Sequence, residues 1–121
     1  MNEIFSKDAV WQQLAGLLAN QHLAVLATHD NGQPYTSLVA FAAAPDLKQL
    51  FFITGDATRK YANLASDPRA AMMIDNRSNT SSDIANAMAA TATGTAAVFA
   101  GVEVNELMGM YLPKHQHLAE F

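Results

Sequence analysis

Residues 51–69 of the 121-residue chain read Phe-Phe-Ile-Thr-Gly-Asp-Ala-Thr-Arg-Lys-Tyr-Ala-Asn-Leu-Ala-Ser-Asp-Pro-Arg. An apolar run that favours a β-strand ends at Thr54, and a short loop containing Gly55 follows it. A helical pattern begins at Thr58 and stops before Pro68, because the residue that precedes a proline avoids helical geometry. The stretch therefore predicts a strand, a loop and a short helix in direct succession.

The sequence on both sides of this stretch is typical of antiparallel strands joined by tight turns. Residues 23–28 form an apolar run, and Asp30-Asn31-Gly32 shortly after it is a strong β-hairpin signal. In the last expected strand, threonines supply the strand preference, and Gly94 indicates a bulge or a close contact. In chain order, the five expected strands cover residues 23–28, 35–43, 49–54, 70–75 and 89–98.

Two further helices flank the expected strands. Ser6 is suited to cap the first of them, whose apolar face continues to about Asn20. Residues 102–121 show a second helical pattern that is broken near Pro113, and residues 77–83 are polar and typical of an exposed loop. Together the elements predict one domain over residues 1–121. Its class is α+β, mainly β: a barrel-like sheet of mostly antiparallel strands with short flanking helices.

Composition narrows the class of protein. Half of the residues are hydrophobic and 15% are charged, which is the balance of a folded globular domain. The chain has no cysteine and its N-terminus has no signal-peptide pattern, so we expect a cytoplasmic protein. The apolar residues 14–28 are interrupted too early to span a membrane. The net charge of -4, without a basic stripe, argues against nucleic acid as a partner.

The start of the expected 58–66 helix combines groups that attract an anion. Thr58 offers a hydroxyl, Arg59 and Lys60 are the only adjacent basic residues in the chain, and a helix N-terminus has unpaired N–H groups and partial positive charge. Cations alone are slightly disfavoured at this end of a helix, whereas a bound phosphate reverses the local electrostatics. The site therefore predicts a small anionic ligand.

The order and spacing of these motifs resemble the FMN-binding split-barrel family related to pyridoxamine 5′-phosphate oxidase. The resemblance runs from about Trp11 to the last residue. It implies a split β-barrel, a homodimer with FMN at the subunit interface, and a flavin-dependent oxidoreductase that acts on a small molecule through unknown catalytic residues. Members continue into a further closing strand, which this chain is expected to lack. The markers are residues 30–34, 52–54, 58–60, 63–64 and 67–69.

The resemblance also implies roles for single residues. Arg59 and Lys60 would hold the FMN phosphate with help from the Thr58 hydroxyl, and residues 53–54 would lie along the flavin. Main-chain groups of residues 37–39 would contact the ring, with a serine where the oxidase has an arginine. From its own position after the fourth strand, Asn76 could reach a cofactor, although a solvated turn explains it equally well. The expected cofactor-binding residues are Ser37, Leu38, Val39, Ile53, Thr54, Thr58, Arg59, Lys60 and Asn76.

Two other functions remain open at this stage. The first is a non-catalytic FMN-binding module. The second is a haem-binding relative of the same fold, which needs an axial histidine. The available histidines are His22, His29, His115 and His117. A metal site at His115 and His117 is disfavoured, because two imidazoles without an evident third ligand make a weak site.

Overall fold

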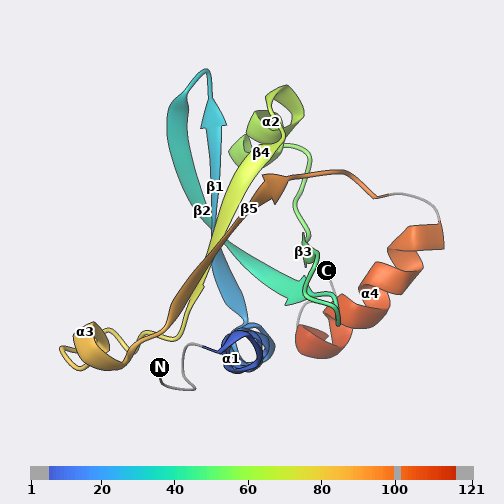
Figure 1. Ribbon diagram of the computed structural model, residues 1–121. Helices are drawn as coiled ribbons and strands as arrows, with labels where there is room; N and C mark the ends of the chain where they lie inside the picture. Colours follow the sequence, from blue (N-terminus) through green and yellow to red (C-terminus); the bar gives the residue numbers. More distant parts are fainter. Residues whose placement is uncertain (1–5, 100–101, 117–121) are drawn as a thin grey trace.

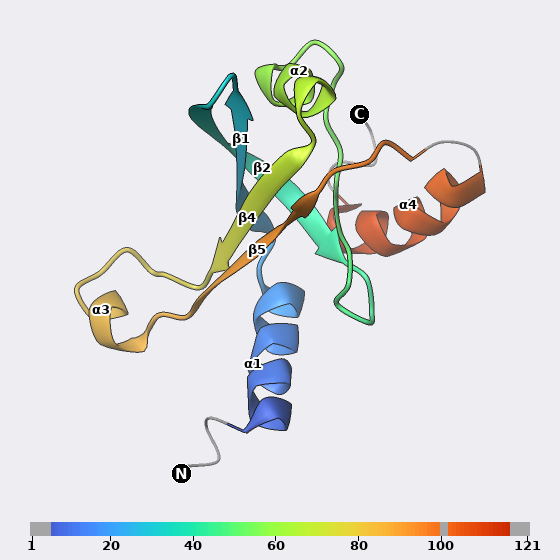
Figure 2. The same cartoon turned by 45° about the horizontal axis from the view of Figure 1, so that its top comes forward.

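The computed structural model of the chain describes residues 6–99 and 102–116. Its centre is an antiparallel five-stranded sheet with the strand order β3-β2-β1-β4-β5. Figures 1 and 2 show that the sheet is strongly curled, like part of a barrel, with the helices around its ends. This confirms the expected mainly-β split barrel. The strands are β1 (Leu23–Asp30), β2 (Gln33–Ala43), β3 (Leu50–Phe52), β4 (Arg69–Asp75) and β5 (Ala89–Thr95).

Four helices accompany the sheet in the described part of the chain. Ser6 caps α1 by accepting a hydrogen bond from the Ala9 N–H at 3.1 Å, as the sequence predicted. The helix that begins beside Thr58 is also confirmed, and it ends at the residue before Asp67-Pro68. None of the helices in the described residues combines the length and apolar character that crossing a membrane requires. The helices are α1 (Lys7–Asn20), α2 (Arg59–Ser66), α3 (Asp83–Asn86) and α4 (Val102–Lys114).

The β1–β2 hairpin has the predicted tight turn. Asp30 pairs with Gln33, so the loop consists of two residues, Asn31 with φ 50° and Gly32 with φ 85°. Positive φ at both positions defines a type I′ turn, whose twist matches that of the flanking strands. The turn fixes the register of the hairpin and therefore which face of β1 and β2 is buried.

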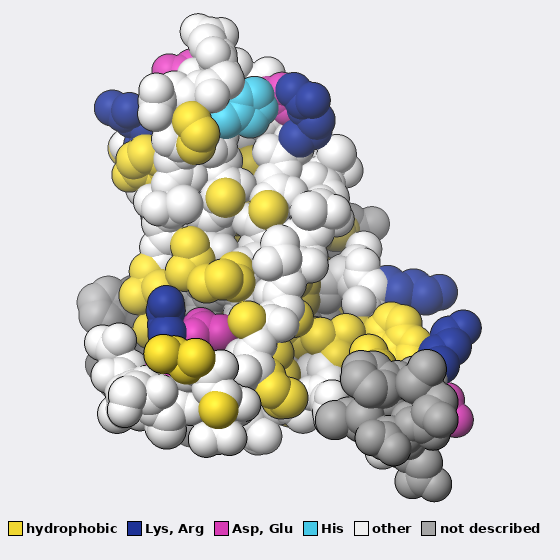
Figure 3. Space-filling model, turned by 60° about the vertical axis from the view of Figure 1, so that its left-hand side comes forward, with side chains coloured by type: hydrophobic (Ala, Val, Ile, Leu, Met, Phe, Trp, Pro, Cys, Tyr) yellow, Lys and Arg dark blue, Asp and Glu magenta, His cyan; other side chains and the backbone are white. Residues whose placement is uncertain are grey.

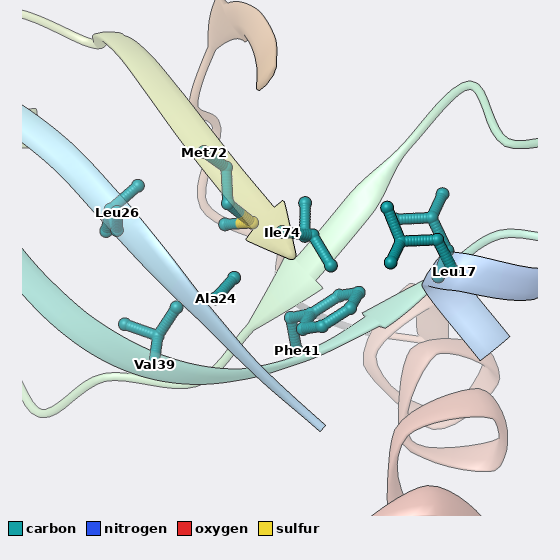
Figure 4. Close-up of a cluster of buried hydrophobic side chains, with 8 residues drawn as sticks. Leu17, Ala24, Leu26, Val39, Phe41, Met72 and Ile74 are labelled. Atoms are coloured by element: carbon teal, nitrogen blue, oxygen red, sulfur yellow. The ribbon is translucent and has the colours of Figure 1, made fainter. Parts of the chain in front are cut away.

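The core lies on the concave face of the sheet. Along β1, burial alternates, with Ala24, Leu26 and Thr28 inside and their neighbours more exposed. Figure 4 shows how side chains from β1, β2, β4 and α1 converge there. Phe41, Leu26 and Ile74 are at most 1% exposed, which makes them the best-packed members. The cluster consists of Leu17, Leu18, Ala24, Leu26, Val39, Phe41, Met72 and Ile74.

β1 and β2 each extend two residues further toward their turn than expected, and the fold differs from the expectation in three other places. β3 ends at Phe52 and not at Thr54, because only residues 50–52 pair with β2. β5 ends at Thr95, and Gly94 pairs with Ala70 in a regular register, without a bulge and with open space where a Cβ would lie. The polar segment after β4 leads into the short helix α3, which the sequence did not predict. There the Asp83 carboxylate accepts backbone hydrogen bonds from residues 78, 79 and 80.

The C-terminal helix is attached to the sheet at its last turn. The Tyr111 hydroxyl donates to the Ala40 carbonyl at 3.2 Å, and His115 Nε2 donates to the Phe41 carbonyl at 2.5 Å. Lys114 Nζ donates to the Leu18 carbonyl of α1 at 2.7 Å. The helix was expected to be broken near Pro113, and it ends one residue later. The expected helical residues 117–121, including His117, lie outside the described residues.

Candidate cofactor-binding site

The start of α2 is held by two threonine hydroxyls. Thr58 Oγ1 accepts from the Tyr61 N–H at 3.2 Å and lies 2.9 Å from Thr54 Oγ1. Both hydroxyls also lie within hydrogen-bond distance of the Gly55 carbonyl, at 3.1 Å from Thr54 and 3.0 Å from Thr58, so one of them donates to this carbonyl while the other donates to its partner hydroxyl. The Thr58 hydroxyl is therefore engaged in shaping the helix start. The N–H groups of Arg59 and Lys60 precede the first intrahelical hydrogen bonds and stay available to a ligand.

The two cations of α2 have no acidic partner among the described residues. The Arg59 guanidinium lies over the Tyr35 ring of β2, 5.5 Å from its centroid, which orients it by a cation–π contact. In contrast, Arg69 and Arg77 form ion pairs with Asp67 at 2.7 Å and with Asp75 at 3.0 Å. Two positive charges without an acidic partner among the described residues thus lie at the end of α2 that already carries partial positive charge.

A free stretch of strand edge lies near this helix start. β3 pairs only with residues 41–43 of β2, so in the described part of the chain no strand covers that edge over residues 33–40. The Phe41 N–H donates to the His22 carbonyl at 3.2 Å, so the main chain of Phe41 faces β1. In an antiparallel pair every second residue faces the same neighbouring strand, so the main-chain groups of Val39 and Ser37 face β1 as well. Leu38 therefore directs its N–H and carbonyl toward the free edge. Of the three expected main-chain contacts, Leu38 is the accessible one.

The side chains of these three residues have different surroundings. Leu38 is 62% exposed, whereas Val39 is buried in the core. Ser37 pairs with Leu26 and therefore lies on the concave face, where its Oγ is buried without a hydrogen-bond partner. A buried hydroxyl is costly when it is unpaired. Since Tyr35, two residues away on the same face, lies under Arg59, this hydroxyl belongs to the same region as the α2 cations.

Ile53 and Thr54 lie between β3 and α2, outside the regular sheet. The Ile53 side chain is 54% exposed. Both residues line an open, largely apolar cavity of about 570 Å³ on the concave side, which extends to β5 and α4. Among the described residues, its lining contains aromatic rings such as Phe51 and Tyr111 but no histidine. The structure therefore places these two residues between the helix start and an apolar cavity.

Asn76 is not part of this cluster. It follows the end of β4 that is remote from α2, and a strand of this length separates the two ends by roughly 20 Å. Its side-chain oxygen accepts from the Met88 N–H at 2.6 Å, and its own N–H donates to the Met88 carbonyl at 3.1 Å. The structure thus shows Asn76 closing the base of the β4–β5 connection.

Three interactions near the site were missed at the level of sequence. Tyr35 supports Arg59, although nothing in the sequence marks a tyrosine 24 positions earlier as its partner. Asn63 Nδ2 donates to Thr28 Oγ1 at 3.0 Å, a buried bond that fixes α2 on β1. His29 Nε2 lies 3.0 Å from Asp67 Oδ2. Of the three, only the Asn63–Thr28 bond had a signal in the sequence, because Asn63 lies on the face of α2 toward the sheet.

The metal interpretation finds no support in the described residues. They contain no group of three or more histidine, cysteine, aspartate or glutamate side chains that could hold an ion. His115 is fully buried and donates through Nε2 to the Phe41 carbonyl. His117 lies outside the described residues.

Comparison with known families identifies the class of protein. The pyridoxamine 5′-phosphate oxidase family matches residues 10–119, and the chain therefore belongs to this family. The match covers α2, the free edge of β2 and the whole sheet. A comparison with curated proteins gave no match.

Solved structures show the same fold at low sequence identity. A haem-binding protein from Mycobacterium smegmatis has 24% identity and a TM-score of 0.72, over 87% of this chain and 44% of that chain. A FAD-binding protein from Mesorhizobium loti has 16% identity and a TM-score of 0.69, over 91% and 78%. HutZ, the haem storage protein from Vibrio cholerae, has 17% identity and a TM-score of 0.71, over 90% and 75%. The chain thus spans less than half the length of the mycobacterial protein.

Proposed function

We propose that the chain is an FMN-binding flavoprotein that works as an FMN-dependent oxidoreductase on a small molecule. The observation that carries the proposal is the pair Arg59 and Lys60 at the positive end of α2, without an acidic partner among the described residues. A dianionic phosphate would offset both charges and accept hydrogen bonds from the free N–H groups of the helix. Family membership makes a flavin phosphate the best candidate anion.

The residues present fit FMN in three respects. Arg59 and Lys60 would hold the phosphate, while Thr58 keeps the helix start in shape. The orphaned Ser37 hydroxyl gives a further polar group on the same face. The free edge at Leu38 offers a main-chain donor and acceptor, which suits the polar rim of a flavin ring.

The protein's own part in the reaction is binding and orientation. FMN, when bound, supplies the redox chemistry, so the site needs no paired acid and base of its own. Ile53 and Leu38 present exposed apolar side chains that can shield a ring from water. Thr54 links the apolar cavity to the start of α2 through its hydrogen bond with Thr58. In this flavin reaction, proton transfer is assigned to none of the chain's own residues.

We further propose that the protein is a homodimer. Direct pairing puts Leu38, Val25, Met73 and Thr91 in one row across four strands of the convex face. Leu38 and Leu23 on this face are 62% and 51% exposed. Figure 3 shows hydrophobic side chains gathered over the middle of one side of the molecule. Such a row is typical of an interface with a second copy.

Light scattering in the presence of FMN tests the dimer. Leu23→Asp should shift the protein toward monomer, because it places a charge in the apolar face. Val10→Asp is the matched control, since Val10 is 49% exposed but lies on α1, outside the sheet. A stable monomer of the unmodified protein at micromolar concentration would contradict the dimer.

Haem binding is the alternative function, because two of the similar structures are described as haem proteins. The large apolar cavity could hold a macrocycle, but its described lining offers no histidine as an axial ligand. A non-catalytic FMN module is the second alternative. The same residues would bind FMN equally well in such a module, because a module and an oxidoreductase need the same contacts to FMN.

The visible spectrum and a titration decide between these functions. We expect flavin absorption bands after incubation with FMN, and no Soret band after incubation with haem and desalting. FMN should bind far more tightly than riboflavin, which lacks the phosphate. Anaerobic reduction of the bound flavin by NADH or NADPH, followed by reoxidation with an electron acceptor, would separate an oxidoreductase from a storage module. Equal affinity for FMN and riboflavin would contradict the phosphate site.

A further inference from the structure

The hairpin tip between β1 and β2 contains the only Asn-Gly step in the chain. Asn31 and Gly32 are both exposed, and the Asn31 side chain makes no hydrogen bond within the described residues. The main-chain nitrogen of the residue after an asparagine can attack the side-chain carbonyl carbon of that asparagine. A glycine in this position, which has no side chain, obstructs the attack least. The tip therefore contains a nucleophile and an electrophile in adjacent residues.

A histidine is in contact with the attacking nitrogen. The Gly32 N–H donates to His29 Nδ1 at 3.2 Å. Because Nδ1 accepts this bond, the ring proton lies on Nε2, which is 3.0 Å from Asp67 Oδ2. The imidazole thus presents an unprotonated nitrogen to the N–H group whose proton must leave.

Asp67 fixes the orientation and tautomer of this imidazole. Hydrogen bonds from Arg69 hold the pKa of the Asp67 carboxyl well below its usual range, so the carboxylate stays ionised. An ionised carboxylate on the far nitrogen also stabilises the imidazolium that forms when Nδ1 takes a proton. The charged groups in this arrangement are Asp67, Arg69 through its ion pair with Asp67, and Asp30, the residue before Asn31. Figure 3 shows histidine, acidic and basic side chains together at one end of the molecule.

We propose that Asn31 is a self-modification site at which His29 acts as the general base and Asp67 as its positioning residue. His29 Nδ1 takes the proton of the Gly32 N–H, and the Gly32 nitrogen forms a bond to Asn31 Cγ. The bond from Cγ to the side-chain nitrogen breaks, and the imidazolium returns its proton to that nitrogen, which leaves as ammonia. The product is a five-membered succinimide. One water molecule then opens it at either carbonyl to give aspartate or isoaspartate. The Gly32 nitrogen is thus within hydrogen-bond reach of the base His29, and His29 is within hydrogen-bond reach of Asp67, which orients it.

The modification would change the hairpin itself. Both products add a negative charge beside Asp30, and isoaspartate inserts one carbon into the backbone of a turn that needs positive φ at two consecutive residues. The register of β1 and β2 depends on this turn. The reaction therefore gives the protein a built-in, irreversible alteration at the tip of its longest hairpin.

The test follows the conversion of Asn31 with time by peptide mass spectrometry, in the full chain at neutral pH. A folded turn normally slows this reaction, because the backbone is held. We expect the opposite here, with conversion about ten-fold or more faster in the folded protein than in the same protein unfolded in urea. His29→Gln can still accept a hydrogen bond but cannot take the proton, and it should lower the folded-state rate by about ten-fold or more. Asp67→Asn should lower it by a smaller factor.

Two controls keep the result specific. His22→Gln changes a histidine outside the hairpin, and Asp46→Asn changes a turn carboxylate that also accepts a backbone N–H. Neither should alter the rate at Asn31. Slower conversion in the folded than in the unfolded protein would overturn the proposal. So would faster conversion in His29→Gln, since His29 would then be a clamp that protects the turn. The comparison of folded with unfolded unmodified protein stands even if a variant does not fold.

Discussion

Among the helix ends that carry lysine or arginine, the end of α4 and the start of α2 use the charge in opposite ways. At the end of α4, Lys114 Nζ donates to the Leu18 carbonyl at 2.7 Å and lies 3.9 Å from the centroid of the Phe41 ring. This carbonyl belongs to the last turn of α1, where helices leave carbonyls unpaired and where positive charge is favoured. Lys114 thus has a carbonyl and a ring as partners and helps to hold α1, α4 and β2 together.

At the start of α2 the situation is reversed. Arg59 and Lys60 lie at the helix end where positive charge is disfavoured, and within the described residues only the Tyr35 ring compensates Arg59. A cation that stabilises the fold is placed where the helix dipole helps it. Cations placed against the dipole, without an acid nearby, are better explained by a ligand. The difference separates a structural lysine, Lys114, from the two cations that are proposed to bind the phosphate.

The largest expected effect concerns the α4 side of this comparison. Phe41 is fully buried, contributes to the core, and supports Lys114 with its ring. Phe41→Ala should reduce the free energy of unfolding by about 3–5 kcal/mol, the usual range for removing a buried phenylalanine. Urea denaturation measures it. Ile84→Ala is the control, because Ile84 is 94% exposed, and its loss should be within about 0.5 kcal/mol. A loss below about 1 kcal/mol for Phe41→Ala would mean that this core is loosely packed.

The second effect concerns the α2 side, and it should appear in binding and not in folding. Arg59→Ala and Lys60→Ala each remove a charge-assisted contact to the proposed phosphate, worth about 1.5–3 kcal/mol. FMN affinity should therefore fall by roughly ten- to a hundred-fold in each variant. Flavin fluorescence titration measures it. Since neither cation has an acidic partner, the free energy of unfolding without FMN should change little.

Riboflavin and two other lysines provide the controls for this experiment. Riboflavin has no phosphate, so its weaker binding should be nearly indifferent to both substitutions. Lys7→Ala and Lys114→Ala remove charges outside the proposed site and should leave FMN affinity unchanged. The same FMN affinity in all four variants would show that Arg59 and Lys60 are a solvated helix start.

These two regions also show what the sequence could predict. The α2 helix and the site proposed at its start were predicted from local signals: a capping residue, two adjacent cations and a proline stop are all encoded within about ten residues. The α4 attachment was not found, because the partners of Tyr111, Lys114 and His115 lie 71 to 96 positions away in the sequence. The contact of Arg59 with the Tyr35 ring was missed for the same reason, since the two residues are 24 positions apart. Asn76 was grouped with the site because it follows a strand, but its strand end is the remote one.

The third prediction isolates the structural lysine. Lys114→Met keeps the apolar stem over Phe41 but leaves the Leu18 carbonyl without its donor. The loss of one such hydrogen bond should reduce the free energy of unfolding by about 1 kcal/mol. FMN affinity should not change, in contrast to Lys60→Ala. If Lys114→Met weakened FMN binding and left the free energy of unfolding unchanged, Lys114 would be a binding residue and not a structural one.

The smallest effect is a dependence on alkaline pH at the last turn of α4. Burial lowers the pKa of Lys114 from its ordinary 10.5 and raises the pKa of Tyr111 from its ordinary 10.0. As the pH rises toward 10.5, the unfolded chain holds more protons at Lys114 than the folded one, so this group makes the protein more stable with rising pH. Tyr111 acts in the opposite direction, because its stabilising contribution is complete below pH 10.0 and is lost as the pH rises through the folded-state pKa.

A Tyr111→Phe background removes the tyrosine effect and leaves the lysine effect. There, urea denaturation at several pH values should show stability that rises toward pH 10.5 relative to the same protein with Lys114→Met. Parallel curves for the two proteins would mean that Lys114 is as well solvated in the folded state as in the unfolded chain.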